Sequence, residues 1–224
     1  MTLSITALCP ESGQLGIAIS SSSIAVGARC PWLQAGIGAV ASQNITLPAL
    51  GPQILAGLES GLTAEQALKR ALGEDRFSEY RQVAVMSADG ISAIFSGEQT
   101  LGIWHVQQGE NCVAAGNMLA SQQVITAMIT AFENATGELT SRLLAALRAG
   151  IDQGGEAGPE HSAAVKVVDD YIWPVVDLRI DWADADPVAS LQALWQAYEP
   201  QMEAYITRAL DPRDAPGYGV PGDE

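Results

Sequence analysis

Apolar and polar side chains alternate from the second residue of the chain onward, a pattern typical of a half-buried β-strand. The apolar face consists of Leu3, Ile5 and Ala7, and the hydroxyl-bearing face of Thr2, Ser4 and Thr6. Residues 9–14 contain the proline and glycine of a turn, and an apolar run resumes at 15–19. The chain is therefore predicted to open with a β-hairpin.

Further along the chain, the pattern switches between the strand period and the helix period. Strands are predicted at 38–44, in a hairpin over 81–97 with an Asp-Gly turn, at 102–106, 112–115, 162–168 and 173–180. Helices are predicted after Pro48, after the N-cap residue Thr63, and over 118–132, 138–150 and 187–210. Residues 26–32 and 152–159 contain glycine and are predicted to be loops.

Blocks of antiparallel strands that alternate with pairs of helices predict an α+β fold, in which two stacked sheets lie between helix layers. A chain of 224 residues with 48% hydrophobic residues can fill one core of this kind. We expect a single domain over residues 1–210. A tail rich in proline, glycine and acids follows at 211–224.

The formal net charge of −15, with only 11 Lys+Arg, leaves no basic patch for nucleic acid or for an anionic membrane surface. Apolar runs stop well short of the roughly 18 residues that a membrane span needs, and the start of the chain lacks a signal-peptide pattern. Three scattered cysteines do not form a disulfide framework. These features predict a cytoplasmic protein.

Thr2 is the leading candidate for catalytic chemistry, because a small second residue permits removal of Met1. Thr2 would then carry a free α-amine beside its own hydroxyl. The amine has an ordinary pKa of roughly 7.7–8.0, so it can accept the hydroxyl proton near neutral pH. The competing interpretation is that threonine stands at position 2 for no catalytic reason.

Other constellations give weaker signals. The two histidines, His105 and His161, have no metal-ligand spacing, so we expect neither a metal site nor a cofactor. A serine nucleophile within 20–23 is an alternative.

Arg29 and Asn117 follow predicted strands beside glycine, where they can bind an oxyanion or cap loop carbonyls. The segment 177–181, with Asp177 and Asp181 flanking Arg179, reads as a charge ladder on one strand face.

A series of segments in one order resembles a known family. These segments are 2–5, 26–32, 36–43, 81–83, 116–119, 142–144, 154–156, 162–164 and 177–181. The family is catalogued as domain of unknown function 1028, and its members look like N-terminal nucleophile (Ntn) hydrolases. The resemblance covers nearly the whole chain up to about Leu194.

The resemblance implies a four-layer αββα sandwich and hydrolysis of an amide-type bond, with Thr2 as nucleophile and its own amine as base. Two segments depart from the family pattern. Cys9-Pro10 stands where an acidic residue is usual, and residues 158–162 replace an Arg-Gly-x-Gln-Ser segment. His161 then puts a titratable group where the family has a neutral amide, which predicts a different substrate.

The sequence therefore predicts an amidohydrolase of small amides that works without a cofactor, and we expect a homo-oligomer. Candidate substrate or oxyanion contacts are Arg29, Gln43, Asn44, Asn117 and His161. One alternative is a metabolite-binding or partner protein on the same fold that turns nothing over. The other is acyl transfer from Ser21 or Ser22.

Overall fold

The computed structural model describes residues 1–221. The strands are β1 (Thr2–Leu8), β2 (Leu15–Ser21), β3 (Pro31–Gln34), β4 (Gly38–Asn44), β5 (Arg81–Ser87), β6 (Ser92–Ser96), β7 (His105–Gly109), β8 (Cys112–Asn117), β9 (Ser162–Val168) and β10 (Pro174–Ile180). The helices are α1 (Leu50–Glu59), α2 (Ala64–Glu74), α3 (Gln123–Asn134), α4 (Leu139–Asp152), α5 (Pro187–Tyr198) and α6 (Met202–Leu210), with 3-10 turns η1 (Val26–Ala28), η2 (Ser78–Tyr80) and η3 (Glu199–Gln201).

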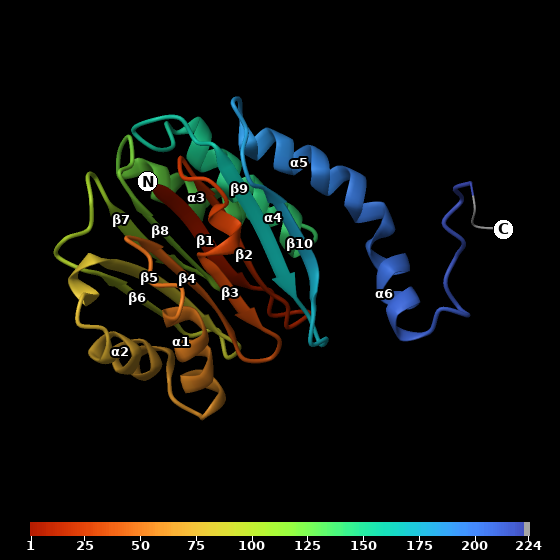
Figure 1. Cartoon of the computed structure of the whole chain (residues 1–224), viewed down its shortest axis with the longest axis horizontal. Helices are drawn as coiled ribbons and strands as arrows, with labels where there is room; N and C mark the ends of the chain where they lie inside the picture. The colour runs from red at the N-terminus through yellow and green to blue at the C-terminus, as the bar shows by residue number, and fades with distance from the viewer. Residues whose placement is uncertain (222–224) are drawn as a thin grey trace.

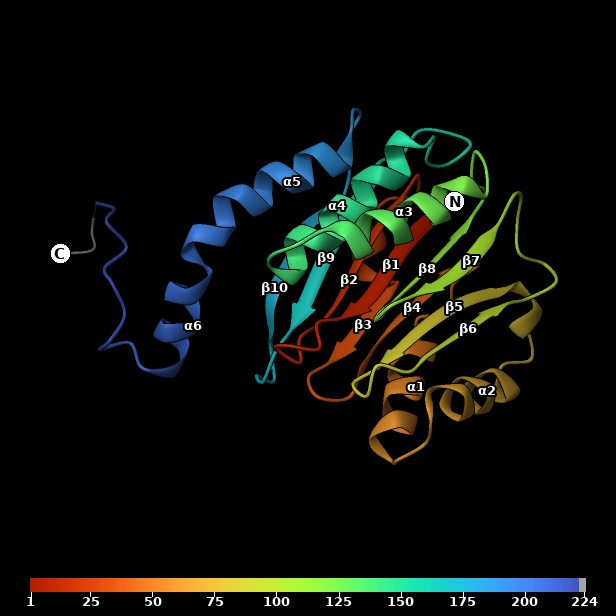
Figure 2. The same ribbon diagram turned by 180° about the vertical axis from the view of Figure 1, so that it is seen from behind.

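The strands form two antiparallel sheets that stack face to face. The larger sheet has the order β10-β9-β2-β1-β8-β7, and the smaller sheet has the order β3-β4-β5-β6. Helices α3 and α4 cover the outer face of the larger sheet, while α1 and α2 cover the outer face of the smaller one (Figures 1 and 2). The predicted four-layer αββα sandwich of the α+β class is confirmed.

Each pair of adjacent layers encloses its own apolar core, because both faces of both sheets are covered. Leu3 and Ile5 of β1 pack with Phe132 of α3 beneath the helices of the larger sheet. Ile54 of α1 and Val83 of β5 belong to the core beneath the other helix pair. Alternation along each strand thus separates the outer core from the layer between the sheets.

The layer between the sheets changes character along its length. Much of it is apolar, with leucines, isoleucines and valines of the larger sheet against small residues such as Ala41 and Ala84 of the smaller one. At the end where β1 begins, buried polar residues replace them: Thr2, Ser4, Ser21, Gln43, Gln82 and Asn117. The hydroxyl face of β1, read from the sequence as one side of a strand, therefore faces the inside of the sandwich.

Two predicted boundaries were wrong because the backbone of each segment forms hydrogen bonds with another segment of the chain. The predicted loop 26–32 ends in the short edge strand β3, which pairs with β4 and begins at Pro31, a position where a strand tolerates proline. Helix α3 starts five residues after Met118 rather than at it. Met118 has a φ of 50°, and its N–H donates to the carbonyl of Leu101 across 2.9 Å, so this segment bonds to another loop.

Two further corrections concern β7 and the last helix. The strand predicted at 102–106 begins only at His105, where it pairs with Gly116. The predicted helix 187–210 is two helices joined by η3, because Pro200 has no N–H for the helical ladder. Helix α5 packs against β9 and β10, and α6 continues from its end beyond the sandwich (Figure 1). Within residues 1–221, no helix has the length and apolarity to cross a membrane.

Gly97 joins β6 to the loop that crosses between the two sheets, and it has no room for a side chain. A Cβ atom there would lie 2.2 Å from the carbonyl oxygen of Glu79, which is backbone and cannot move aside. We expect Gly97→Ala to lower the free energy of unfolding by about 1–3 kcal/mol, measured by urea denaturation.

Gly73 supplies the matched control for this substitution. It lies in α2, and a Cβ atom there would meet nothing within 4 Å. Gly73→Ala should stabilise the protein by up to about 1 kcal/mol, because alanine favours the helix. Equal effects of the two substitutions would contradict the proposed backbone contact at Gly97.

Candidate functional site

The register of the larger sheet brings the ends of four neighbouring strands together at one end of the sheet. Thr2 at the start of β1 pairs with Asn117 at the end of β8. On its other side, Leu3 pairs with Ser20, which puts Ser21 of β2 beside Thr2. Ser21 in turn pairs with Ser162 at the start of β9. A row of polar residues from strands far apart in the sequence therefore lines this end of the sandwich.

Two hydroxyl groups in this row converge on one carbonyl oxygen. Thr2 is 5% exposed, and its Oγ1 donates to the carbonyl oxygen of Met1 across 2.5 Å. Ser21 Oγ donates to the same oxygen, also across 2.5 Å, and lies 3.5 Å from Thr2 Oγ1. The N–H of Ser23 donates to Ser21 Oγ across 3.0 Å. The Met1 carbonyl oxygen is thus held between the hydroxyls of Thr2 and Ser21.

A chain of buried amides connects this row to the smaller sheet. Ser4 Oγ donates to Gln43 Oε1 across 2.7 Å, and Gln43 Nε2 donates to Gln82 Oε1 across 2.8 Å. Asn117 Nδ2 donates to the same Gln82 oxygen across 3.0 Å. These side chains are at most 1% exposed, so their mutual hydrogen bonds replace those to water.

One buried acceptor at the site is left over. Asn117 Oδ1 has no hydrogen-bond partner among residues 1–221. Because Asn117 pairs with Thr2 across β1 and β8, this oxygen lies on the same face as the Thr2 hydroxyl. A buried acceptor of this kind is suited to receive an N–H group from a bound molecule.

Glu156 is a site residue that the sequence reasoning missed. Its carboxylate accepts the N–H of Ser22 across 3.0 Å, and the side chain is buried, with 4% exposure. Gly154 and Gly155, both with positive φ, form the turn before it, and Glu156 itself bridges to Leu119. The glycine pair was the available signal, since such a turn can bring the next side chain against a strand end.

Burial of Glu156 raises the pKa of its carboxyl group to about 8. The positive N-terminal amine of the chain opposes this shift, whereas the charge of Glu160 adds to it. Glu160 also accepts the backbone N–H of Glu156 across 2.9 Å. A carboxyl group with a pKa near 8 therefore lies against the backbone of Ser22, one residue after Ser21.

Arg29 and Asn44 bond mainly to loops. Arg29 Nη1 donates to the carbonyls of Ile24 and Ala25, across 2.5 and 3.2 Å. Asn44, which has a φ of 69°, donates to the carbonyl of Tyr80 across 2.6 Å and accepts the N–H of Leu101 across 3.2 Å. Both side chains hold the loops around the polar end of the sandwich in place.

His161 adjoins the row through its backbone. Its N–H donates to the carbonyl of Ser21 across 2.9 Å. The ring stacks on Trp182 with centroids 4.3 Å apart, and Nδ1 lies 2.8 Å from the carbonyl oxygen of Ala183. A carbonyl only accepts, so Nδ1 carries a proton and Nε2 is the remaining ring atom for other contacts.

Comparison with known proteins assigns the family. The chain belongs to the family of unknown function (DUF1028), whose model matches residues 2–191, so the predicted family is confirmed. The crystal structure of protein SPO2555 from Silicibacter pomeroyi, of the same family model, is 33% identical. The match covers 88% of this chain and 85% of that one, with a TM-score of 0.82.

A second solved structure is much less similar. Anbu (ancestral beta-subunit) from Yersinia bercovieri is 10% identical and has a TM-score of 0.40, with 91% of this chain and 97% of that chain covered. A score at this level does not establish a shared fold. No curated protein matches the chain.

Gln82 is the centre of the buried amide chain, and its loss should destabilise the fold. Gln82→Leu keeps the volume but leaves the donors of Gln43 and Asn117 without their acceptor. We expect a loss of about 3 kcal/mol in the free energy of unfolding by urea denaturation. Gln108→Leu, which removes two exposed bonds to Ser92, should change it by less than about 0.5 kcal/mol.

Glu156 should make stability depend on pH. Between its ordinary value of 4.5 and about 8, the folded state keeps a proton that the unfolded state has lost. Stability of the native protein therefore falls as pH rises through this window, by up to about 1.4 kcal/mol per unit. Glu156→Gln removes this dependence. Urea denaturation at pH 5 and pH 8 should therefore show that the free energy of unfolding of the variant, relative to that of the native protein, is higher at pH 8 than at pH 5. A difference that stays constant between the two pH values would contradict the assignment.

Proposed function

We propose that this protein is an Ntn-type amidohydrolase that uses Thr2, after removal of Met1, to hydrolyse a small amide. The observation that carries the proposal is the position of the Thr2 side chain. It lies buried on the inner face of the central strand β1, with its hydroxyl 3.5 Å from Ser21 Oγ. A nucleophile needs such a water-poor site with donors aimed at the developing charge.

The carbonyl of Met1 stands in for the substrate carbonyl in this proposal. It accepts from both hydroxyls, so it marks where an acyl oxygen is held. Once Met1 is gone, the Thr2 α-amine is free, and the position of the Met1 carbonyl, which bonds to Ser21 Oγ, is vacated. Ser21 Oγ then donates to the acyl oxygen, and the orphan Asn117 Oδ1 accepts the substrate N–H.

The reaction proceeds in two balanced halves. The α-amine takes the Thr2 hydroxyl proton while Oγ1 attacks the amide carbon, and the C–N bond then breaks as that proton passes to the leaving amine. An ester of Thr2 remains. Water, deprotonated by the same α-amine, attacks this ester, releases the carboxylic acid and returns the hydroxyl proton to Thr2. These steps use only groups of the chain and water.

Of the remaining candidate residues, Gln43, Arg29 and Asn44 act on this centre indirectly, and His161 acts directly. Gln43 holds Ser4 and Gln82 in register and thereby fixes Asn117. We assign Arg29 and Asn44 to positioning the loops at the mouth, and His161 Nε2 to contact with the substrate. The homo-oligomer and the cytoplasmic location stay predictions of the sequence.

A second function, ligand binding without turnover, is favoured by one observation. A cavity of about 570 Å³ opens between the two sheets, and neither Thr2 nor Ser21 lines it. A protein that binds a metabolite there needs no nucleophile. Acyl transfer from Ser21 is the third possibility, since its hydroxyl faces the same carbonyl as that of Thr2.

Substitution of Thr2 tests the proposal directly. With Met1 removal verified by mass spectrometry, the protein should release ammonia or amine from a member of a panel of small amides. Thr2→Ala should lower turnover by roughly 10³-fold or more, because the nucleophile is lost, whereas Thr2→Ser should retain activity. The measurement is product formation under single-turnover and steady-state conditions.

Thr6→Ala is the matched control, because Thr6 lies on the same face of β1 and its buried hydroxyl has no hydrogen-bond partner within residues 1–221. That variant should turn over at the native rate. Unchanged turnover in Thr2→Ala, with an acyl probe on the peptide that contains Ser21, would identify Ser21 rather than Thr2 as the nucleophile. Absence of product from every amide, with ligand binding retained, would favour the binding protein.

A further inference from the structure

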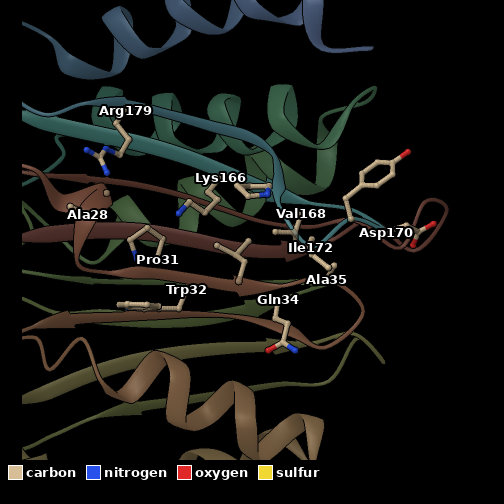
Figure 3. Close-up of a pocket in the computed structure, with 14 residues that line it drawn as sticks. Ala28, Pro31, Trp32, Gln34, Ala35, Lys166, Val168, Asp170, Ile172 and Arg179 are labelled. Atoms are coloured by element: carbon tan, nitrogen blue, oxygen red, sulfur yellow. The ribbon is translucent and has the colours of Figure 1, made fainter. Parts of the chain in front are cut away.

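The unequal size of the two sheets leaves part of the inner face of the larger one without a partner strand. Edge strand β3 of the smaller sheet faces β2 and β9, and a cavity of about 570 Å³ lies between β3 and the β9–β10 pair. Figure 3 shows Lys166 and Arg179 on one side of this cavity and Pro31 and Trp32 on the other. Its volume is in the range of small-molecule sites.

Part of the cavity wall is apolar. Pro31 and Leu33 of β3, Val168 of β9 and Ile172 of the β9–β10 turn contribute to it. Leu33 is partly buried against the core between the sheets, so this wall is anchored. A bound molecule with an aliphatic body would remove this surface from water.

Two cations lie side by side in the cavity because of the strand register. Lys166 pairs with Asp177, and Arg179 pairs with Ala164, so the two cations are diagonal neighbours on one face of β9–β10. Each makes one ion pair, Lys166 Nζ with Asp177 across 3.0 Å and Arg179 Nη2 with Asp181 across 2.9 Å. Their other N–H groups have no acceptor in the part of the chain that the structure describes.

The carboxylates nearby restrict the charge of a ligand. Asp177 and Asp181 already balance the two cations, and Asp170 also lines the cavity. In a chain of formal net charge −15, a multiply charged anion is repelled. A single carboxylate, which accepts from spare Lys166 and Arg179 donors, meets the least repulsion while still gaining charge-assisted hydrogen bonds.

A turn of backbone separates this cavity from Thr2. Turn η1 lies on β9: Val26 N–H donates to Ser162 Oγ across 3.1 Å, and a Cβ atom on Gly27 would lie 2.5 Å from Ala164 Cβ. Gly27 and Ala28 face the cavity on one side of the turn. Ser21 and Ser23, before the turn, belong to the Thr2 row.

We propose that this cavity is a second binding site, which takes a small aliphatic monocarboxylate. The carboxylate binds to Lys166 and Arg179, and the aliphatic part lies against Pro31, Leu33 and Val168. This site does not depend on turnover at Thr2, because η1 keeps the two apart.

Isothermal titration calorimetry of the full chain with hexanoate tests the site, with hexanol as the uncharged probe of the same length. We expect saturable binding of hexanoate at millimolar concentration or below, and binding of hexanol at least about tenfold weaker. Thr2→Ala should bind hexanoate as the native protein does, which separates this site from the proposed active site.

Three variants locate the bound carboxylate. Lys166→Gln and Arg179→Gln should each weaken hexanoate binding about tenfold, because each removes a charged donor. Ala28→Trp should abolish binding by filling the cavity without a change of charge. This variant still tests the site if Lys166→Gln or Arg179→Gln fails to fold. Arg70→Gln, an exposed site on α2 that pairs with Glu74, removes the same charge elsewhere and should leave binding unchanged.

Several results would overturn the proposal. One is the lack of saturable heat with hexanoate up to about 10 mM, which corresponds to a negligible affinity. Another is binding that persists in Ala28→Trp or in both charge variants. Equal affinity for hexanoate and hexanol would show that the cations do not recognise the ligand, and loss of binding in Thr2→Ala would put the ligand at the other site.

Discussion

The burial of polar side chains between two sheets is the constraint on which the rest of this structure depends. At one end of the sandwich, side chains of Ser4, Gln43, Gln82 and Asn117 are withdrawn from water. They are tolerated because each finds a partner on the facing sheet, and the unpaired alternative is costly. The amide chain therefore sets the relative position of the sheets where Thr2 lies.

At the polar end, the loops bond to one another and leave the hydroxyls of the site free for other partners. Loops from several strand ends bond to one another there, as Asn44 does with Leu101 and Met118 with the Leu101 carbonyl. These bonds fix the backbone around the site without using the hydroxyls of Thr2 and Ser21. Within residues 1–221, those hydroxyls bond only to the Met1 carbonyl, to each other and to the N–H of Ser23 just after β2, so a small change at the terminus alters their partners.

The same fold offers two different environments on the inner face of the larger sheet. Near Thr2 the groups are neutral hydroxyls and amides with one buried carboxyl, Glu156, which suits chemistry on a polar bond. On the far side of η1 the face carries Lys166 and Arg179 above an apolar wall. The difference arises from the overhang of β9 and β10, since uncovered strands keep charged side chains that a covered layer would exclude.

Much of the fold was determined by the sequence itself. Alternation and turn residues gave the hairpins β1–β2 and β5–β6, Thr63 marked the start of α2, and the order of the elements indicated stacked sheets between helices, because these signals act over short range. Thr2 was recognisable as a candidate for the same reason: its amine and hydroxyl belong to one residue.

Tertiary structure alone decided what surrounds Thr2. Strand register, which no local pattern states, put Asn117 and Ser21 on either side of it and brought Gln82 from the other sheet. Glu156 looked like one acid among many until the Gly154-Gly155 turn placed it in a buried position, where loss of water raises its pKa. Charge state, burial and partners depend on contacts between distant segments, so they appear only when the chain is folded.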